Sequence, residues 1–216
     1  MDDSTSGTLQ GRVLTTRNRF GELLNACGLL GPGAEVGVQC GKFSEHILRC
    51  WKGRPLILVD AWRYFPDCPD DHQNVSDAEH ERRYHETLKR LVRFANRFRI
   101  HRMLSEEAAA LYRDGELDWA YIDARHNYSA VRSDLHAWYP TVKPGGIFAG
   151  HDYFNGVRDP INPRTRRPIP VPDSEVTPEI LEQYGVKAAV DEFAALHGKQ
   201  VFVTTADTFN SWWWIK

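Results

Sequence analysis

LDWAYIDARHNY (residues 117–128) joins a short apolar run to a group of polar side chains. The run over 117–122 has the length and the residue types of a buried β-strand. It ends at Asp123, and His126 follows three residues later. Apolar side chains then recur at 131, 135 and 138, which is the spacing of one face of a helix. The stretch therefore predicts a strand followed directly by a helix, with polar residues at the connection.

The same unit recurs on both sides of this stretch. Apolar runs that predict strands lie at four further places: 34–38, 55–60, 98–103 and 146–151. Helical periodicity lies between them, at 43–51 and in a long helix over 77–98. Ser76 and Glu79 have the spacing of a capping box at the start of this long helix. Alternating strands and helices predict an α/β domain with a mostly parallel sheet.

The last part of the chain has a different pattern. Residues 200–204 and 209–215 are two β-type runs that predict a hairpin, which makes the final strand antiparallel to the others. Three consecutive tryptophans lie in this strand. Since side chains alternate along a strand, we expect Trp212 and Trp214 to point to one face of the sheet and Trp213 to the other. We expect the strand to be buried between two neighbours.

The composition is that of one soluble globular domain. The 27 Lys and Arg nearly balance the 29 Asp and Glu, and this net charge of −2 excludes a strongly basic nucleic-acid-binding protein. The eight Lys and Arg of residues 82–102 are interpreted as a solvated helix face. Residues 1–10 are unlike a signal peptide, and no run approaches the ~20 apolar residues of a membrane span. The four cysteines form no C-x-x-C pair, so we expect reduced thiols in a cytoplasmic protein.

Two proline-containing segments interrupt the alternation of strands and helices. They are residues 65–75, which are also rich in aspartate, and residues 154–178, which contain six prolines. High proline density disfavours regular structure, so we expect loop insertions, the second folded over one end of the sheet. Arg164, Arg166 and Arg167 lie in the second segment. We hypothesise that they bind an anionic or polyhydroxylated substrate.

A glycine-containing turn follows the predicted strand at 34–38. Glu35, Gly37 and Gly41 form the pattern E-x-G-x-x-x-G. Glycines at such a turn let the backbone approach a ligand and expose the first N–H groups of the next helix. Asp60 ends the next strand about 20 residues later, where nucleotide-binding α/β folds place an acid that binds ribose hydroxyls. A tight turn without a ligand and a simple strand-end cap are the alternatives.

Taken with residues 117–128, these motifs resemble those of class I S-adenosylmethionine-dependent methyltransferases. The resemblance extends over residues 34–216. It is most specific where several patterns follow one another: DWAYIDARH at 118–126, DLHAW at 134–138, VKPGG at 142–146 and GHDY at 150–153. The sequence is most similar to small bacterial methyltransferase-domain proteins and to the macrocin-type sugar O-methyltransferases.

The resemblance implies a Rossmann-like class I methyltransferase fold. This fold has a mainly parallel seven-stranded sheet with an antiparallel last strand, and helices cover both faces. The chain is then divided into an N-terminal helical lead-in, residues 1–32, and a single methyltransferase domain, residues 33–216. The loop insertions at 65–75 and 154–178 belong to that domain.

The resemblance also implies which residues bind the cofactor, S-adenosyl-L-methionine. The glycine-containing turn matches the motif that holds the methionine part, Asp60 matches the acid that binds the ribose, and Ser105 lies in the loop that passes the adenine. Asp123 matches the acidic residue beside the transferred methyl group. The expected cofactor-binding residues are Glu35, Gly37, Val38, Gly41, Asp60, Ala61, Trp62, Ser105 and Asp123. Gln39 and Cys40 stand where many members of the family have a second glycine.

Acidic and histidine side chains end two neighbouring predicted strands. Asp123 follows one strand and His151 and Asp152 follow the next, and neighbouring strands lie ~4.8 Å apart. These groups can therefore converge at the carboxyl edge of the sheet, where open α/β sheets bind ligands. Two carboxylates suit Mg²⁺ or Mn²⁺, and imidazoles favour Mn²⁺ or Fe²⁺, so all three residues are candidate metal ligands. A hydrogen-bonded His151–Asp152 pair that shapes the pocket without a metal is the alternative.

His126 is the first candidate for a general base. Methyl transfer from a sulfonium needs a positioned and partly deprotonated acceptor oxygen, and a neutral imidazole with its ordinary pKa of ~6.5 can take that proton. His126 and Asp123 are therefore the predicted catalytic residues. The alternative is that His126 is a surface residue that caps the helix over 127–139.

The predicted reaction is methyl transfer from S-adenosylmethionine to an oxygen of a small hydroxylated acceptor, with a divalent metal as a candidate assistant. A non-catalytic module that binds the cofactor in the same fold is one alternative. A nicotinamide-dependent oxidoreductase is another, but it would need G-x-G-x-x-G where the sequence has GVQCG at 37–41. We expect a small-molecule partner, no nucleic acid and no membrane, and a homo-oligomer is left open.

Overall fold

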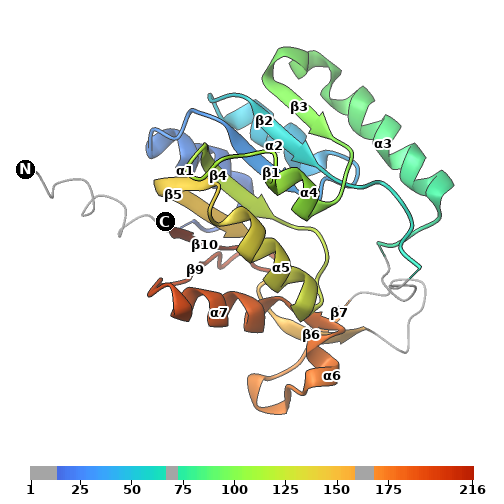
Figure 1. Cartoon of the computed structure of the whole chain (residues 1–216), viewed down its shortest axis with the longest axis vertical. Coiled ribbons are helices and arrows are strands. Elements are labelled where there is room, and N and C mark those ends of the chain that lie inside the picture. Colours follow the sequence, from blue (N-terminus) through green and yellow to red (C-terminus); the bar gives the residue numbers. More distant parts are fainter. Residues whose placement is uncertain (1–13, 67–72, 159–167) are drawn as a thin grey trace, which may run out of the picture.

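The computed structural model describes residues 14–66, 73–158 and 168–216. Its main element is a seven-stranded sheet with the order β3-β2-β1-β4-β5-β10-β9 (Figure 1). The strands are β1 Gly33–Val36, β2 Leu56–Val59, β3 Phe98–His101, β4 Leu117–Ile122, β5 Val142–Gly150, β9 Phe202–Val203 and β10 Trp212–Ile215. Strands β1 to β5 pair in parallel, and β10 runs antiparallel to both of its neighbours. The predicted sheet, with its antiparallel last strand, is confirmed.

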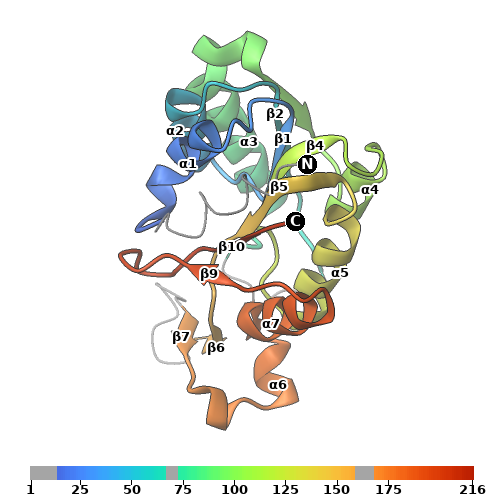
Figure 2. The ribbon, with the colours of Figure 1, turned by 90° about the vertical axis from the view of Figure 1, so that its left-hand side faces the viewer.

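Helices cover both faces of this sheet (Figure 2). They are α1 Phe20–Ala26, α2 Lys42–Cys50, α3 Asp77–Leu91, α4 Ser105–Ala109, α5 Tyr128–Trp138, α6 Pro178–Leu181 and α7 Val186–Leu196, with 3₁₀ turns η1 Arg17–Arg19, η2 Val92–Arg97 and η3 Asp173–Glu175. Helices α1, α2 and α3 pack on one face, and α4, α5 and α7 on the other. Each layer buries its own apolar cluster against the sheet. The Rossmann-like architecture predicted for the chain is therefore present.

The three tryptophans of β10 contribute to both clusters. Trp212 and Trp214 belong to the cluster under α5 and α7, whereas Trp213 belongs to the cluster under α1 and α2. All three are 1% exposed. Strand β10 lies between β5 and β9, so its residues are covered by strands at both edges and by helices on both faces. The predicted alternation and burial are confirmed.

The helix predicted over 77–98 is shorter than expected. Helix α3 ends at Leu91, a 3₁₀ turn follows, and β3 begins at Phe98. The break has a local cause, because Phe94 has φ −109° and ψ 18°, outside the helical range. Val92, the first residue of this turn, is 68% exposed. At the other end, the Oγ atom of Ser76 accepts a hydrogen bond from the backbone N–H of Glu79 at 3.3 Å, which confirms the predicted cap.

The proline-rich segment 154–178 contains short strands, which corrects the prediction of an irregular loop. Strands β6 Asn155–Arg158, β7 Pro168–Pro170 and β8 Tyr184–Gly185 form an antiparallel three-stranded sheet in the order β7-β6-β8. Proline is tolerated here because β7 is an edge strand with one neighbour. Strand β6 follows β5 closely, so this small sheet lies at the carboxyl edge of the large one (Figure 1).

The basic face of α3 is largely balanced by acidic side chains. Arg82 and Arg90 pair with Glu86 at 3.1 and 2.7 Å, and Arg102 pairs with Glu81 at 2.5 Å. The side chains of these pairs are 25–60% exposed, so each pair contributes little stability on its own. The pairing supports the interpretation of a solvated helix face.

Two further sequence-based expectations concern the chemistry of the surface. Cys27, Cys40 and Cys50 form no disulfide among the described residues, and Cys68 lies outside them. No helix in the described part of the chain combines the length and the apolar character that crossing a membrane requires. The division of the chain at residue 33 stays a prediction.

Removal of the last six residues, 211–216, is expected to abolish cooperative folding. The deletion eliminates β10, leaves β9 without its neighbour in the sheet and removes three fully buried tryptophans, each worth about 3–5 kcal/mol when truncated to alanine. Near-ultraviolet circular dichroism and urea unfolding would measure the effect, with Leu196→Ala at a 71% exposed position as the control. A truncated protein with a sharp unfolding transition would contradict this topology.

Candidate functional site

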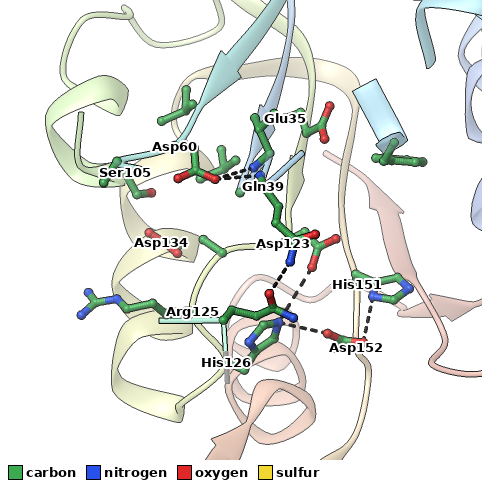
Figure 3. Close-up of a pocket in the computed structure, with 18 of the residues that line it drawn as sticks. Glu35, Gln39, Asp60, Ser105, Asp123, Arg125, His126, Asp134, His151 and Asp152 are labelled. Carbon is green, nitrogen blue, oxygen red and sulfur yellow. Dashed lines mark hydrogen bonds and ion pairs between the residues drawn. The ribbon is translucent and has the colours of Figure 1, made fainter. Parts of the chain in front are cut away.

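A pocket of about 740 Å³ lies at the carboxyl edge of the parallel strands. This volume is typical of small-molecule sites. Most predicted site residues line it: Glu35, Gly37, Val38, Asp60, Ala61, Ser105, Asp123, His126, His151 and Asp152. Gly41 and Trp62 are not among the residues that line it. Figure 3 shows how the side chains from β1 to β5 follow one another along this edge.

The turn after β1 brings the backbone close to Asp123. Gly37 has φ +93°, and a Cβ atom there would lie 1.9 Å from the carbonyl oxygen of Asp123. Only glycine fits such an approach. Gly41 has φ +69° and begins α2 from a left-handed conformation, with Thr87 packed against it. Both predicted glycines therefore shape the turn, and of the two it is Gly37 that borders the pocket.

Asp60 connects the turns that follow β1 and β2. Its Oδ2 atom accepts hydrogen bonds from the backbone N–H groups of Val38 at 3.0 Å and Gln39 at 2.8 Å (Figure 3). Its Oδ1 atom accepts one from the backbone N–H of Trp62 at 2.8 Å. The buried indole of Trp62 donates in turn to the carbonyl of Gln39 at 2.8 Å. Asp60 thus orders both turns while it lines the pocket at the place predicted for the ribose.

Glu35 carries a buried carboxyl group at the pocket wall. The residue is 1% exposed, and its Oε2 atom has no hydrogen-bond partner in the described structure. Burial raises the pKa of Glu35 to about 8. At neutral pH the group is therefore largely protonated until a cation comes close to it.

Ser105 and Asp134 lie at the β3 end of the pocket (Figure 3). Ser105 begins α4, and its Oγ atom accepts a hydrogen bond from the indole N–H of Trp138 at 2.9 Å. Asp134 of α5 is 4% exposed, and burial raises its pKa to about 7. Sequence analysis did not single out Asp134 as a site residue. The available signal was an acid at i+3 from Val131, on the apolar face of a predicted helix.

Asp123, His126 and Asp152 converge where β4 and β5 end (Figure 3). The Nε2 atom of His126 lies 3.0 Å from Oδ2 of Asp152 and 3.8 Å from Oδ1 of Asp123. One possible ligand atom from each residue lies within 4.8 Å of the others. His151 contacts Asp152 through the other carboxylate oxygen, with Nδ1 2.8 Å from Oδ1. His126, predicted as a base, therefore joins the two predicted acidic ligands.

The two carboxylates hold His126 in its protonated form. Burial lowers the pKa of His126, but the nearby carboxylates of Asp123 and Asp152 outweigh burial and raise the pKa to about 10. Burial likewise opposes the charge of Asp152, yet His126 and His151 keep its pKa well below the ordinary range. The Tyr184 hydroxyl donates to Oδ2 of Asp152 at 2.6 Å, and its ring stacks on His126 with centroids 4.7 Å apart. The cluster is an ordered group of alternating charges.

Arg17 is a pocket residue that sequence analysis missed. It lies in η1, and its Nη2 atom donates to Oδ2 of Asp123 at 3.1 Å. The guanidinium lies over the ring of Phe43, 4.1 Å from the centroid. Burial disfavours the charge, but Tyr121, Asp123 and Glu35 raise the pKa of Arg17 above its ordinary value. No motif marked Arg17 because it precedes the part of the chain that carries the resemblance.

A family model described as a methyltransferase domain matches residues 34–153, more than half of the chain. The chain belongs to this methyltransferase-domain family. The matched range contains the turn after β1, Asp60 and the cluster of Asp123, His126 and Asp152. No curated protein sequence matches the methyltransferase.

Solved structures share the fold of this methyltransferase at low sequence identity. An O-methyltransferase from Bacillus cereus in complex with SAH has 13% identity and a TM-score of 0.57, covering 100% of this chain and 92% of that one. The O-methyltransferase NovP has 18% identity and a TM-score of 0.57, covering 93% of this chain and 77% of that one. The family and the fold identify a class I S-adenosylmethionine-dependent methyltransferase, as the sequence predicted.

The arginines of the proline-rich segment cannot be placed in the methyltransferase site. Arg164, Arg166 and Arg167 lie outside the described residues, and the hypothesis that they bind substrate stays a prediction. Pro168, the first residue of β7, lines the pocket. The segment that follows these arginines therefore does reach the site.

Glu35→Gln is expected to change how stability depends on pH. Glu35 has a pKa of about 8 in the folded protein and 4.5 ordinarily, so between these values the unfolded chain has released a proton that the folded protein retains. The contribution of this group to the free energy of unfolding therefore falls as pH rises between these values, by about 1.4 kcal/mol per pH unit. Urea unfolding at pH 5 and pH 8 should show that the variant is more stable relative to the wild type at pH 8 than at pH 5.

The exposed Glu175→Gln provides the matched control for this comparison. It should leave the difference from the wild type independent of pH. If Glu35→Gln also gave the same difference at both pH values, the carboxyl group would not be protonated in the folded protein.

Proposed function

We propose that this enzyme transfers the methyl group of S-adenosylmethionine to an oxygen of a small hydroxylated acceptor, and that a divalent cation held by Asp123, His126 and Asp152 assists the transfer. The acceptor is bound at the carboxyl ends of β4 and β5. The observation that carries the proposal is the convergence of these three side chains in the pocket that most of the predicted cofactor residues also line.

The donor set fits a divalent cation. Two carboxylates and one imidazole offer ligand atoms within 4.8 Å of one another, and the three residues are largely buried. The Nε2 atom of His126 is close to both carboxylates but makes no well-aligned hydrogen bond in the described structure. Hard oxygens with one nitrogen favour Mn²⁺ over Mg²⁺. This set replaces His151 of the sequence-based prediction with His126.

His151 has a supporting role in this proposal. Its Nδ1 atom contacts Oδ1 of Asp152 at 2.8 Å, while Tyr184 donates to Oδ2 at 2.6 Å. Contacts of this kind orient a ligating carboxylate and tune its basicity. Asp152 also has φ +57°, a conformation that is uncommon outside glycine. Several groups therefore keep its carboxylate directed toward His126.

A bound cation would supply positive charge that lowers the pKa of an acceptor hydroxyl and orients it. His126 would lose its proton when it becomes a ligand, because only the neutral imidazole coordinates. In the protein without a cation, a pKa of about 10 keeps this histidine protonated and prevents it from acting as a base at neutral pH. Its predicted role as general base therefore requires conditions in which the ring is neutral.

Asp123 is the residue that would align the two reactants. It follows β4 directly, and its Oδ2 atom is held by Arg17 at 3.1 Å while Oδ1 faces His126. The acceptor oxygen, the methyl carbon and the sulfur must lie in line for the displacement. Positioning of this kind supplies ~7–11 kcal/mol in well-held reactions. A carboxylate fixed from two sides suits such a function.

An organic acceptor is supported by the aromatic rings that line the pocket. They include Phe43, Phe65, Tyr184 and Phe209. Apolar walls with a few polar groups are typical of sites for small organic ligands. The O-methyltransferases of Bacillus cereus and NovP, whose fold this enzyme shares, support oxygen as the acceptor atom.

Mn²⁺ is expected to stabilise the chelator-treated enzyme, and Asp152→Asn or His126→Gln is expected to remove that effect. A ligand at 100 times its Kd adds about 2.7 kcal/mol of stability, and each kcal/mol raises the Tm of a chain of this size by about 2–4 °C. Thermal unfolding with and without Mn²⁺ measures the shift relative to the metal-free form of each variant. Asp173→Asn, at a carboxylate with 65% exposure, is the control. Shifts retained in both pocket variants would contradict the site.

Methyl-labelled S-adenosylmethionine should yield methyl ethers from a panel of catechols, sugars and hydroxy acids. Mass spectrometry identifies the product, and amines matched in shape provide the comparison. Asp123→Asn should lower kcat by about 100-fold or more, because it removes the charge that aligns the acceptor. Methylation of amines alone would contradict an oxygen acceptor.

A further inference from the structure

An arginine and a buried carboxyl group line the pocket near the end of β1 without pairing with each other. Arg17 and Glu35 both line it, and no ion pair joins them among the described residues. The cofactor of this enzyme has a methionine part with an α-ammonium and an α-carboxylate group. We propose that Arg17 binds the α-carboxylate of this part, with Glu35 facing the α-ammonium. The proposal rests on the cofactor of the methyltransferase and not on its acceptor or metal.

The order of strands places the methionine part at this end of the pocket. Ser105 follows β3, Asp60 follows β2, Glu35 lies in β1 and Asp123 follows β4. Because β3, β2, β1 and β4 are successive neighbours, these residues follow one another along one edge. With the ribose at Asp60 and the methyl group facing Asp123, the amino-acid part lies over the end of β1 and the start of α2. Phe43 of α2 lines this region, and the guanidinium of Arg17 lies over its ring.

The backbone contacts of Arg17 show how it is held there. The carbonyl of Thr15 accepts hydrogen bonds from the backbone N–H groups of Thr205 at 3.1 Å and Ala206 at 2.9 Å. The backbone N–H of Arg17 donates to Oδ2 of Asp207 at 2.8 Å. The segment before α1 is therefore fastened to the connection between β9 and β10. Its anchoring directs a cationic side chain to the pocket.

Arg17 and Glu35 both have side-chain atoms that could form further hydrogen bonds. The Arg17 guanidinium has five N–H donors, and within the described residues one side-chain hydrogen bond is formed, from Nη2 to Asp123 at 3.1 Å. The Oε2 atom of the 1% exposed Glu35 has no partner there. A buried charged group requires a partner of opposite charge. A bound zwitterion would supply both partners at once, its carboxylate to Arg17 and its ammonium group to Glu35.

Lys42 is the rival partner for the α-carboxylate. It also lines the pocket and is the first residue of α2. Its side chain is exposed, whereas that of Arg17 is 22% exposed and lies against Phe43. A guanidinium also presents two parallel N–H groups that match the geometry of a carboxylate. These differences favour Arg17, and Lys42→Met provides a control that removes the same charge from the same pocket.

Ligands that lack one group at a time test the proposal. Isothermal titration of the full chain, with chelator present, would use S-adenosylmethionine, its decarboxylated form and 5′-methylthioadenosine, which lacks both charged groups. Arg17→Met should weaken the affinity for S-adenosylmethionine by about 10- to 100-fold, because it removes charge-assisted hydrogen bonds. It should leave the affinities for the other two ligands unchanged. Arg17→Lys should restore part of the affinity, and Lys42→Met should leave all three ligands unchanged.

Glu35→Gln should change the three affinities in a different pattern. It should weaken binding of S-adenosylmethionine and of the decarboxylated form, since both retain the ammonium group, and leave the affinity for 5′-methylthioadenosine unchanged. Circular dichroism checks that each variant is folded. If Arg17→Met did not fold, two other results would still test the proposal. The wild type should bind S-adenosylmethionine more tightly than its decarboxylated form, and Arg17→Lys should reduce the ratio of these two affinities.

Several outcomes would overturn the assignment. Equal weakening of all three ligands by Arg17→Met would show a structural role, exerted through Asp123. A loss in Lys42→Met confined to S-adenosylmethionine would assign the carboxylate to Lys42. A wild type that binds 5′-methylthioadenosine as tightly as S-adenosylmethionine would exclude any charged subsite, and one that binds no ligand would overturn the cofactor itself. Neither oxygen methylation nor metal binding enters this experiment, so their failure is measured separately.

Discussion

The close approach of Gly37 to the backbone of Asp123 is the constraint on which the site depends. The backbone N–H of Asp123 donates to the carbonyl of Val36 at 2.7 Å, so the ends of β1 and β4 meet at the pocket floor. A Cβ atom at residue 37 would lie 1.9 Å from a carbonyl oxygen and force these ends apart. The turn predicted to bind the cofactor lies on one side of the contact, and the cluster of Asp123 and His126 lies on the other. Their relative position is therefore set by backbone rather than by flexible side chains.

Charge is distributed unevenly along the edge of the sheet. Asp60 accepts hydrogen bonds from three backbone N–H groups, whereas Glu35 retains a proton. Toward β5, Asp123 and Asp152 are balanced by Arg17 and His126. Buried charges without partners are costly, so each acid is either paired, hydrogen-bonded or protonated. A positively charged ligand at this edge must displace a bound proton or an existing ion pair. Its affinity therefore depends on the free energy needed to release that proton or to break that pair.

Most of the fold could be predicted because its signals are local. Strands buried on both faces, such as 56–59 and 117–122, read as apolar runs, and the alternation of residues 212–214 follows from strand geometry. The small sheet could not be predicted, because proline is tolerated in β7 only as an edge strand beside β6. In the site, the acids at strand ends were predictable from their position. Two features were not predictable: which of His126 and His151 lies between the two acids, and the presence of Arg17 in the pocket. Both depend on packing between segments far apart in sequence.

The anchoring of Arg17 gives the pocket an order of assembly. Its wall joins Thr15 to Thr205 and Ala206, and Arg17 to Asp207, three residues that a ribosome adds almost last among the described residues. Strand β10, which follows that connection, must also enter the sheet between β5 and β9. A nascent chain that has already formed β1 to β5 therefore still lacks this wall. The contacts of Thr15 and Arg17 with residues 205–207 therefore form only after the chain has been translated to its last strands, and the wall of the pocket is completed only then.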